Sequence, residues 1–89
     1  PAEIEELLVH HPAVAEAALI GVADARWGEV GLAIVALKPG ASAQASELID
    51  FCRGKIANYK LPKSVVLVER LPRNAMGKVV KEVLKRQYG

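Results

Sequence analysis

The order of apolar and polar positions along the chain predicts six elements. Apolar residues recur at helical spacing in three segments, and in three others they form nearly continuous runs that are typical of buried strands. The predicted helices cover residues 1–11, 42–57 and 79–86, and the predicted strands cover residues 14–22, 32–37 and 65–68. Residues 32–37 are apolar throughout, which favours a central strand covered on both faces. We therefore predict an α+β fold in which about three helices pack on a sheet of about three strands, as two layers that share one core.

Residues with known preferences for helix ends mark the boundaries of the predicted helices. Pro1 suits a first helical turn, and Pro12 ends that helix because proline lacks the backbone N–H that a helix interior needs. Ser42 is a suitable N-terminal cap for the second helix, and Asn58 is a suitable stop. Cys52 falls on the apolar stripe of that helix. We interpret it as a core residue, since a nucleophilic cysteine needs an accessible, electropositive setting and a partner base.

Length and composition indicate one small domain. A chain of 89 residues can bury about 60 to 65% of the surface that it exposes when unfolded, enough for a core without disulfides or metals. One cysteine excludes an internal disulfide, and the adjacent His10 and His11 point about 100° apart on a helix, which makes joint binding of one metal ion difficult. No apolar run approaches 18 residues and no signal peptide is recognised, so we expect neither a membrane span nor export.

The formal net charge of +2 at pH 7 hides a division between the two halves of the chain. Residues 1–52 hold two basic and eight acidic residues, a balance of −6, whereas residues 53–89 hold ten basic and two acidic residues, a balance of +8. Such a basic segment can attract phosphate-bearing ligands, nucleic acid or a membrane surface. Its basic residues are not interleaved with aromatic ones and no nucleic-acid motif is present, so we favour a phosphate-bearing cofactor and expect no nucleic acid. The alternative is a free-standing binding or regulatory module that docks an acidic partner or RNA.

The single tryptophan, Trp27, lies in a polar connection over residues 23–29, between Arg26 and Gly28. A lone tryptophan in a small domain is commonly a core anchor. Its place outside both neighbouring apolar runs separates Trp27 from the predicted core. From the residues alone, the core-anchor interpretation stays open beside a role at the surface.

Residues 71–78, Leu-Pro-Arg-Asn-Ala-Met-Gly-Lys, are predicted to form a loop that presents its side chains. Pro72 has no backbone N–H and disfavours continuation of the preceding strand, Asn74 tolerates a left-handed backbone, and Gly77 allows a sharp turn. Lys78 therefore lies at a corner, just before the last predicted helix. An ammonium group on a short loop that is braced by a helix is a positioned cation.

Lys78 also fits two other descriptions. Most lysines are solvated surface residues without a specific role. A phosphate-binding P-loop would place a glycine five positions before Gly77 and a serine or threonine after Lys78. Pro72 stands where that first glycine belongs, and Val79 stands where the hydroxyl residue belongs, so the P-loop is excluded.

The loop sequence LPRNAMGK resembles the last core motif of the adenylate-forming enzymes, which comprise acyl-coenzyme A synthetases, luciferase-type ligases and peptide-synthetase adenylation domains. Three further segments extend the resemblance over nearly the whole chain. They are PAEIE at residues 1–5, HPAV at residues 11–14 and YKLPK at residues 59–63. The resemblance implies that residues 1–89 form one domain, the mobile C-terminal domain of an AMP-forming acyl-CoA ligase whose large N-terminal domain is absent from the chain.

The resemblance also implies a reaction in two steps and a role for Lys78. A carboxylic acid attacks the α-phosphate of ATP to give an acyl adenylate and pyrophosphate, and the thiol of coenzyme A (CoA) then displaces AMP. Lys78 matches the lysine of the first step, on a loop supported by Pro72 and Gly77. ATP and Mg²⁺ are held by the family's N-terminal domain, so this domain alone is expected to be inactive. The acid that is activated is not encoded in these residues.

A second set of residues matches the family's surface for CoA. Trp27 lies where some relatives stack an aromatic ring on adenine, with Arg26 near phosphate, and Tyr59 lies where relatives carry an aromatic residue near the pantetheine arm. For Tyr59, packing at the end of the second helix is the alternative. The aromatic Trp27 favours CoA over a carrier protein as the acceptor, which leaves a peptide-synthetase adenylation domain as the alternative enzyme.

Two further expectations follow from the resemblance. The pattern of a proline, four residues and Gly-Lys resembles the site at which a lysine acyltransferase modifies such enzymes, and here this site is Lys78. The resemblance also implies a cytoplasmic enzyme of carboxylic acid metabolism, with fatty acid metabolism as one branch.

Overall fold

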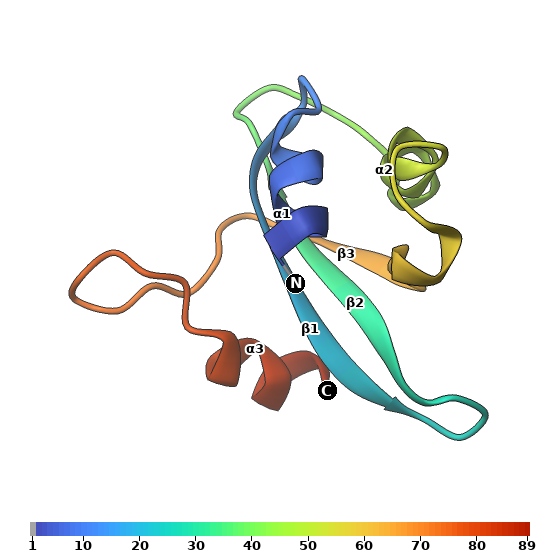
Figure 1. The fold of residues 1–89 in the computed structure, drawn as a ribbon. Coiled ribbons are helices and arrows are strands. Elements are labelled where there is room, and N and C mark those ends of the chain that lie inside the picture. Colours follow the sequence, from blue (N-terminus) through green and yellow to red (C-terminus); the bar gives the residue numbers. More distant parts are fainter. Residues whose placement is uncertain (1) are drawn as a thin grey trace.

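A computed structural model describes residues 2–89 and shows three helices and three strands (Figure 1). The elements in chain order are α1 (Ala2–Val9), β1 (Val14–Asp24), β2 (Gly28–Leu37), α2 (Ala45–Cys52), the short 3₁₀ turn η1 (Asn58–Lys60), β3 (Ser64–Val68) and α3 (Lys81–Tyr88). The predicted α+β class and the numbers of helices and strands are confirmed.

The three strands form one mixed sheet in the order β1-β2-β3. β1 and β2 pair antiparallel from Val14 opposite Leu37 to Asp24 opposite Gly28, whereas β2 and β3 pair parallel. The parallel pair needs a crossover connection, which α2 and η1 supply. β2 lies in the middle, and its residues 32–36 are all buried, so the predicted central strand is confirmed.

The helices lie on both faces of the sheet, and each face has its own apolar cluster (Figure 1). α1 and α2 cover the face that carries Ala33 and Val35. α3 covers the opposite face, where its Leu84 packs with Leu32 and Ile34. The single shared core expected from the sequence is therefore divided in two, because alternate residues of the wholly apolar β2 supply both faces.

A β-bulge near the start of β1 changes which face its residues supply. The pairing register with β2 shifts between Val14 and Glu16. Val14 belongs to the cluster under α1 and α2, whereas Ala18 belongs to the cluster under α3, although an even number of residues separates them. The extra residue of the bulge thus directs Glu16 and Ala18 toward the α3 side of the sheet.

Several helix boundaries differ from the predicted ones. α1 ends at Val9, and Pro1 lies outside the described residues. α2 begins at Ala45 with Gln44 as its N-terminal cap residue, so the predicted cap at Ser42 is wrong. α2 ends at Cys52, before residue 57, because the chain extends at residue 53 and then turns at Gly54, which has a positive φ of 78°.

The turn between β1 and β2 and the start of α3 also differ from the sequence expectations. The two strands pair as far as Asp24 and Gly28, so the predicted connection over residues 23–29 is shorter than expected. α3 begins at Lys81, two residues later than predicted, because Val79 and Val80 are extended and pair with the chain ahead of the loop.

Candidate functional site

The loop that ends in Lys78 is folded by its own backbone and by one asparagine side chain. Asn74 Oδ1 accepts hydrogen bonds from the N–H groups of Met76, at 2.9 Å, and Lys78, at 3.1 Å. The Gly77 N–H donates to the Asn74 carbonyl at 2.9 Å, and the Asn74 N–H donates to the Lys78 carbonyl at 2.9 Å. Gly77 has φ +82°, a conformation that glycine adopts without strain. Asparagine and glycine at these positions therefore set the turn.

The two chain segments that flank the loop pair with each other. Arg73 and Val79 form an antiparallel bridge, and the Val80 N–H donates to the Pro72 carbonyl at 3.0 Å. Leu71, just before the loop, is buried in the cluster under α3. The loop therefore extends from an anchored base away from the sheet (Figure 1).

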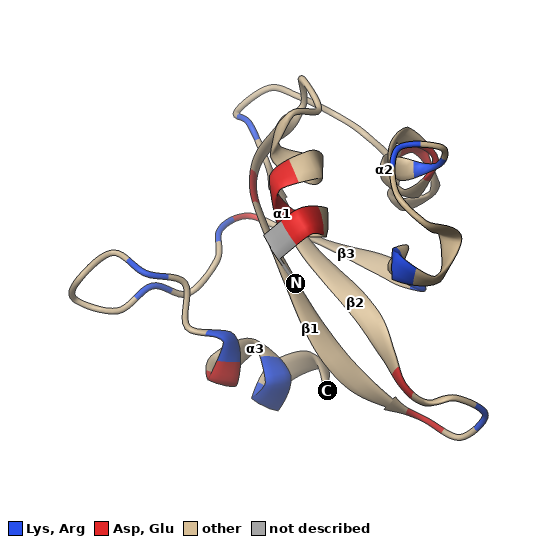
Figure 2. Ribbon diagram, viewed as in Figure 1, with Lys and Arg blue, Asp and Glu red and all other residues tan. Residues whose placement is uncertain are grey.

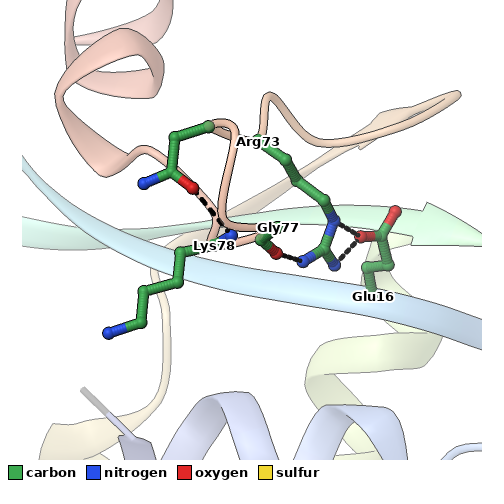
Figure 3. A network of polar contacts seen from close by, with 5 residues as sticks. Glu16, Arg73, Gly77 and Lys78 are labelled. Carbon is green, nitrogen blue, oxygen red and sulfur yellow. Dashed lines mark hydrogen bonds and ion pairs between the residues drawn. The ribbon is translucent and has the colours of Figure 1, made fainter.

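Lys78 combines a fixed backbone with a free side chain. Its N–H and its carbonyl are both hydrogen-bonded to Asn74, as described above. Its side chain is exposed and extends away from the neighbouring ion pair (Figure 3). Among residues 2–89, no carboxylate forms an ion pair with the Lys78 ammonium group. The arrangement presents an unneutralised cation from a defined backbone position.

Arg73 joins this loop to the sheet. Its Nε donates to Glu16 Oε1 at 2.9 Å, its Nη2 contacts the same oxygen, and its Nη1 donates to the Gly77 carbonyl at 2.5 Å (Figure 3). Neither Arg73 nor Glu16 is among the site residues predicted from the sequence. The two residues are 57 positions apart, and the bulge that aims Glu16 at the loop leaves no signal in the apolar pattern.

A second group of candidate residues surrounds the tight turn between β1 and β2. Asp24 Oδ1 accepts hydrogen bonds from the N–H groups of Arg26, at 2.8 Å, and Trp27, at 2.9 Å. Asp24 Oδ2 lies 3.2 Å from the Lys63 ammonium group. The Trp27 N–H, the Arg26 N–H and the Lys63 ammonium all favour the ionised carboxylate, so the pKa of Asp24 is lowered from its ordinary value of 3.8.

The two predicted aromatic residues of the CoA surface are both exposed. Trp27 is 65% exposed, and the Arg26 guanidinium carbon lies 5.0 Å from its ring centroid. Tyr59, in η1, is 85% exposed, with the Lys60 ammonium 5.9 Å from its ring centroid. The core-anchor interpretation of Trp27 and the packing interpretation of Tyr59 are therefore wrong. Both side chains are accessible to a ligand.

A groove of about 680 Å³ runs along the paired strands beside Tyr59. Gly21 and Gly31 lie opposite each other in the hairpin and both line it, as does Leu61. Two facing glycines leave the strand surface without side chains at this point, and the Glu29 carboxylate lies over Gly21. The groove gives the Tyr59 end of the molecule a concave surface.

The structure does not bring all predicted site residues together. Tyr59 lines the groove beside residues 19–21 and 29–31 of the β1–β2 hairpin, and the Asp24–Lys63 contact joins this hairpin to the segment that follows η1. Arg26 and Trp27 lie in the turn at the end of β1, whereas the Lys78 loop contacts Glu16 near the start of β1 and projects away from the sheet (Figure 1). The chain thus carries two separate candidate sites.

The acidic and basic residues, whose positions along the chain are marked in Figure 2, form a set of ion pairs in the fold. Five of these pairs join an acidic residue of the first half to a basic residue of the second half. They are Glu3–Lys60, Glu5–Lys81, Glu16–Arg73, Asp24–Lys63 and Asp50–Arg53. The basic half is therefore partly neutralised by the acidic half. This neutralisation argues against a continuous basic surface that would bind RNA or an acidic partner.

The remaining candidate residues have structural roles. Cys52 is fully buried, and burial raises the pKa of its thiol, which supports its interpretation as a core residue. His10 Nδ1 lies 2.7 Å from the Glu6 carbonyl oxygen, and His11 Nδ1 accepts the Ala13 N–H at 3.1 Å, as expected at a helix end. Within the described residues 2–89, no three His, Cys, Asp or Glu side chains form a group that could hold a metal. None of the helices in that range has the length and apolar character that a membrane crossing requires.

Comparison with known families gives one match that covers most of the chain. The family described as AMP-binding enzyme C-terminal domain matches residues 3–78. A propanoyl:CoA ligase of Rhodococcus jostii, whose acyl group carries a methyl-dioxo-octahydroindene ring, is 48% identical over 98% of this chain and 17% of its own length. The long-chain-fatty-acid–CoA ligase FadD13 of Mycobacterium tuberculosis is 42% identical over 99% of this chain and 17% of its own length.

Solved structures agree with this match. Apo MatB from Rhodopseudomonas palustris has a TM-score of 0.94 and 42% identity over 99% of this chain and 18% of that chain. The amide bond synthetase McbA from Marinactinospora thermotolerans has a TM-score of 0.90 and 29% identity over 97% of this chain and 17% of that chain. The chain thus spans less than a fifth of the length of each of these relatives.

Proposed function

Because the chain belongs to the AMP-binding enzyme C-terminal domain family, we propose that it is the C-terminal domain of an ATP-dependent, AMP-forming ligase that joins a carboxylic acid to CoA. Its curated relatives are CoA ligases, and each is several times longer than this chain. The observation that carries the proposal is the Lys78 loop, which presents an unpaired cation from a fixed backbone. The partner of the domain is then the enzyme's own N-terminal domain.

In the first step, a carboxylate oxygen attacks the α-phosphorus of ATP. A bond forms between that oxygen and phosphorus, the bond from phosphorus to the oxygen that bridges to the β-phosphate breaks, and pyrophosphate leaves. The reacting groups are both anionic, so an ammonium group placed near them lowers their repulsion as the charge redistributes. Lys78 supplies this group and keeps its proton.

In the second step, the CoA thiol loses its proton and its sulfur bonds to the acyl carbon. The bond between that carbon and the oxygen that links it to the phosphate of AMP breaks, and AMP leaves. We assign the CoA surface to Trp27, Arg26 and Tyr59. Stacking of a base on an aromatic side chain contributes about 1 to 3 kcal/mol in nucleic-acid systems. The exposure of Trp27 and the nearby Arg26 guanidinium support this assignment.

The distance between the two candidate sites bears on how the steps alternate. The Lys78 loop contacts Glu16 near the start of β1, whereas the Trp27 turn lies at the end of β1 (Figure 1). One placement of this domain against a shared active site cannot present both ends. We therefore propose that the domain turns between adenylation and thioester formation.

The remaining ligands are assigned outside this chain. Within residues 2–89 the side chains do not fit a metal site, so we assign Mg²⁺ and the main ATP contacts to the N-terminal domain. We place the enzyme in the cytoplasm, where ATP and CoA are available, and in carboxylic acid metabolism, with fatty acid metabolism as one branch. Long-chain fatty acids, 2-succinylbenzoate, ferulate and indoleacetate, the acids in the names of relatives, form the first panel of substrates to test.

The test is the substitution Lys78→Ala in the ligase that contains this domain. We expect adenylation, measured by ATP–pyrophosphate exchange with an acid of the panel, to fall by about 10² to 10³. Thioester formation from supplied acyl adenylate should stay at the parental rate. Lys38→Ala, which removes an exposed lysine from a different turn, is the matched control and should leave both steps unchanged. Equal loss of both steps in Lys78→Ala would contradict the assignment.

The CoA surface is tested separately with Trp27→Ala. If Trp27 stacks on adenine, the loss of about 1 to 3 kcal/mol corresponds to a rise of about 5-fold to 150-fold in the KM for CoA. Adenylation should be unaffected. An unchanged KM for CoA together with slower adenylation would remove Trp27 from the CoA surface.

We also propose that a lysine acyltransferase controls the enzyme through Lys78. An acylated lysine is a neutral amide, so it would no longer offset the negative charge in the first step. The exposure of the Lys78 side chain makes it accessible to another enzyme. Incubation with such an acyltransferase and an acyl-CoA should add one acyl group at Lys78 by mass spectrometry and abolish adenylation. An unmodified Lys78 would contradict the proposal.

A further inference from the structure

We propose that Arg73 is a positioning residue for adenylation and that Glu16 holds Arg73 in place. The inference rests on the proposed function of Lys78 and adds to it the means by which the lysine is oriented. Arg73 touches no reacting group in this proposal. It acts through the peptide bond that precedes Lys78.

The peptide unit between Gly77 and Lys78 is held at both of its polar atoms. Arg73 Nη1 donates to the Gly77 carbonyl at 2.5 Å, and Asn74 Oδ1 accepts the Lys78 N–H at 3.1 Å. A peptide bound at both ends cannot rotate about its flanking bonds without breaking a hydrogen bond. The direction in which the Lys78 side chain leaves the backbone is thereby fixed.

Arg73 is in turn fixed by Glu16. Its Nε and Nη2 both contact Glu16 Oε1, while its Nη1 points to the loop (Figure 3). The Glu16 side chain is only 23% exposed, on an edge strand directly after the bulge. The planar guanidinium can serve two acceptors at once, which a lysine at this position would do poorly.

Few other contacts hold the loop against the sheet. Residues 73–78 are all exposed, and Met76 is 83% exposed. Within residues 2–89, the contact between Arg73 and Glu16 is the single side-chain hydrogen-bonded contact from residues 73–78 to a strand. The hydrogen bonds that the Asn74 side chain accepts come from the loop itself. Loss of this contact would leave the turn formed but free to pivot on its base. A shift of about 1 Å in a group that orients reactants can lower a rate by about 10².

The experiment compares the two half-reactions in the ligase that carries Arg73→Ala. We expect ATP–pyrophosphate exchange with an acid of the panel to fall about 10-fold to 100-fold. Thioester formation from supplied acyl adenylate should stay within about twofold of the parent, which also shows that the variant is folded. Arg86→Ala, which removes an exposed arginine of α3 outside this network, is the matched control and should change neither step.

A double-mutant cycle separates positioning from direct contact. If Glu16 acts through Arg73, then Glu16→Ala should slow adenylation to a similar degree, and the double variant should lose no more than Arg73→Ala alone. Glu16→Gln retains an acceptor oxygen and should recover part of the loss. Adenylation by Arg73→Lys should remain slow, because an ammonium group cannot donate to Glu16 and to the Gly77 carbonyl at once as the planar guanidinium does.

Hydrogen exchange gives a readout that does not depend on the acid. Amide exchange over residues 73–78 should be faster in Arg73→Ala and Glu16→Ala than in the parent ligase, and unchanged in Arg86→Ala. Parental adenylation and parental exchange in Arg73→Ala would overturn the inference while leaving Lys78 in its role. A loss in Arg73→Ala that Glu16→Ala does not share would assign Arg73 a direct contact with ATP, and would also overturn it. Parental adenylation in Lys78→Ala would instead refute the proposed function.

Discussion

The turn before Lys78 can be tested by replacing one glycine with alanine. Gly77 has φ +82°, and a Cβ atom placed on it would meet no atom within 4 Å outside the two adjacent residues of the chain. Steric overlap with the rest of the protein is therefore absent, and the effect of Gly77→Ala comes from local backbone conformation. Gly40, in the turn after β2, has φ +77° and the same open surroundings, so Gly40→Ala is a matched control at a distant site.

The magnitude follows from two opposing effects. A left-handed backbone at a residue with a Cβ atom costs about 1 to 2 kcal/mol. Alanine also restricts the unfolded chain, which returns about 0.4 to 1 kcal/mol. Gly77→Ala and Gly40→Ala should each lower the free energy of unfolding by about 1 kcal/mol. At an m-value of about 1 kcal/mol/M, the urea midpoint of the 89-residue chain falls by about 1 M in both.

The two variants should differ in adenylation. The strain at residue 77 lies in φ and is relieved most directly by rotating the peptide between Met76 and residue 77. This rotation breaks the hydrogen bond from the N–H of residue 77 to the Asn74 carbonyl and so disturbs the turn that sets the Lys78 backbone. In the full ligase, ATP–pyrophosphate exchange should therefore fall at least about tenfold in Gly77→Ala and remain parental in Gly40→Ala. Equal adenylation in the two variants would refute the link between the Gly77 backbone and the placement of Lys78.

Three further predictions concern the domain itself. Leu84 is fully buried under the sheet, so Leu84→Ala should lower the free energy of unfolding by about 2 to 5 kcal/mol in urea titrations followed by circular dichroism, and a loss below about 1 kcal/mol would contradict its burial. The pKa of Asp24 is lowered, so the stability that the ionised Asp24 carboxylate gives to the hairpin is fully present above pH 3.8. This stability is lost as the pH falls from 3.8 through the lowered pKa. Trp27 fluorescence should accordingly stay constant from about pH 7 to 5 and change only below about pH 4. Cys52 is buried with a raised thiol pKa, so a disulfide reagent should label it only after unfolding in urea, and rapid labelling of the native chain would contradict this.

The sheet could be predicted from the sequence because its strands are marked by continuous apolar runs. The run over residues 32–37 indicated a central strand, and β2 is central. The two strands of the hairpin are longer than the apolar runs that predicted them. Their backbones stay paired at Gly21 opposite Gly31 and beyond, and two glycines without side chains give the sequence no apolar pattern there. The helix cap predicted at Ser42 was wrong because α2 begins only at Ala45, after Gln44 in an extended conformation and without a side-chain cap.

The Lys78 loop could be predicted from its motif, whereas its support could not. Asn74 and Gly77 act locally, so their preferences are visible in the sequence. Glu16 and Arg73 meet only after the bulge has moved Glu16 to the α3 side of the sheet. The face of the sheet to which the residues of β1 point changes at a single unpaired residue. The apolar pattern before and after that residue gives no sign of the change. Contacts of this kind require the three-dimensional structure.

The length of β1 has a consequence for how such an enzyme can diversify. Glu16, which supports the Lys78 loop, and Asp24, which shapes the Trp27 turn, are eight residues apart on β1, or about 26 Å at roughly 3.3 Å per residue. Substitutions in one turn therefore leave the hydrogen bonds of the other intact. Under the proposed function, a descendant of this ligase can acquire a new acceptor through changes at residues 24–28 while it inherits its adenylation chemistry unaltered. The two half-reactions are then separate targets for natural selection and for protein engineering.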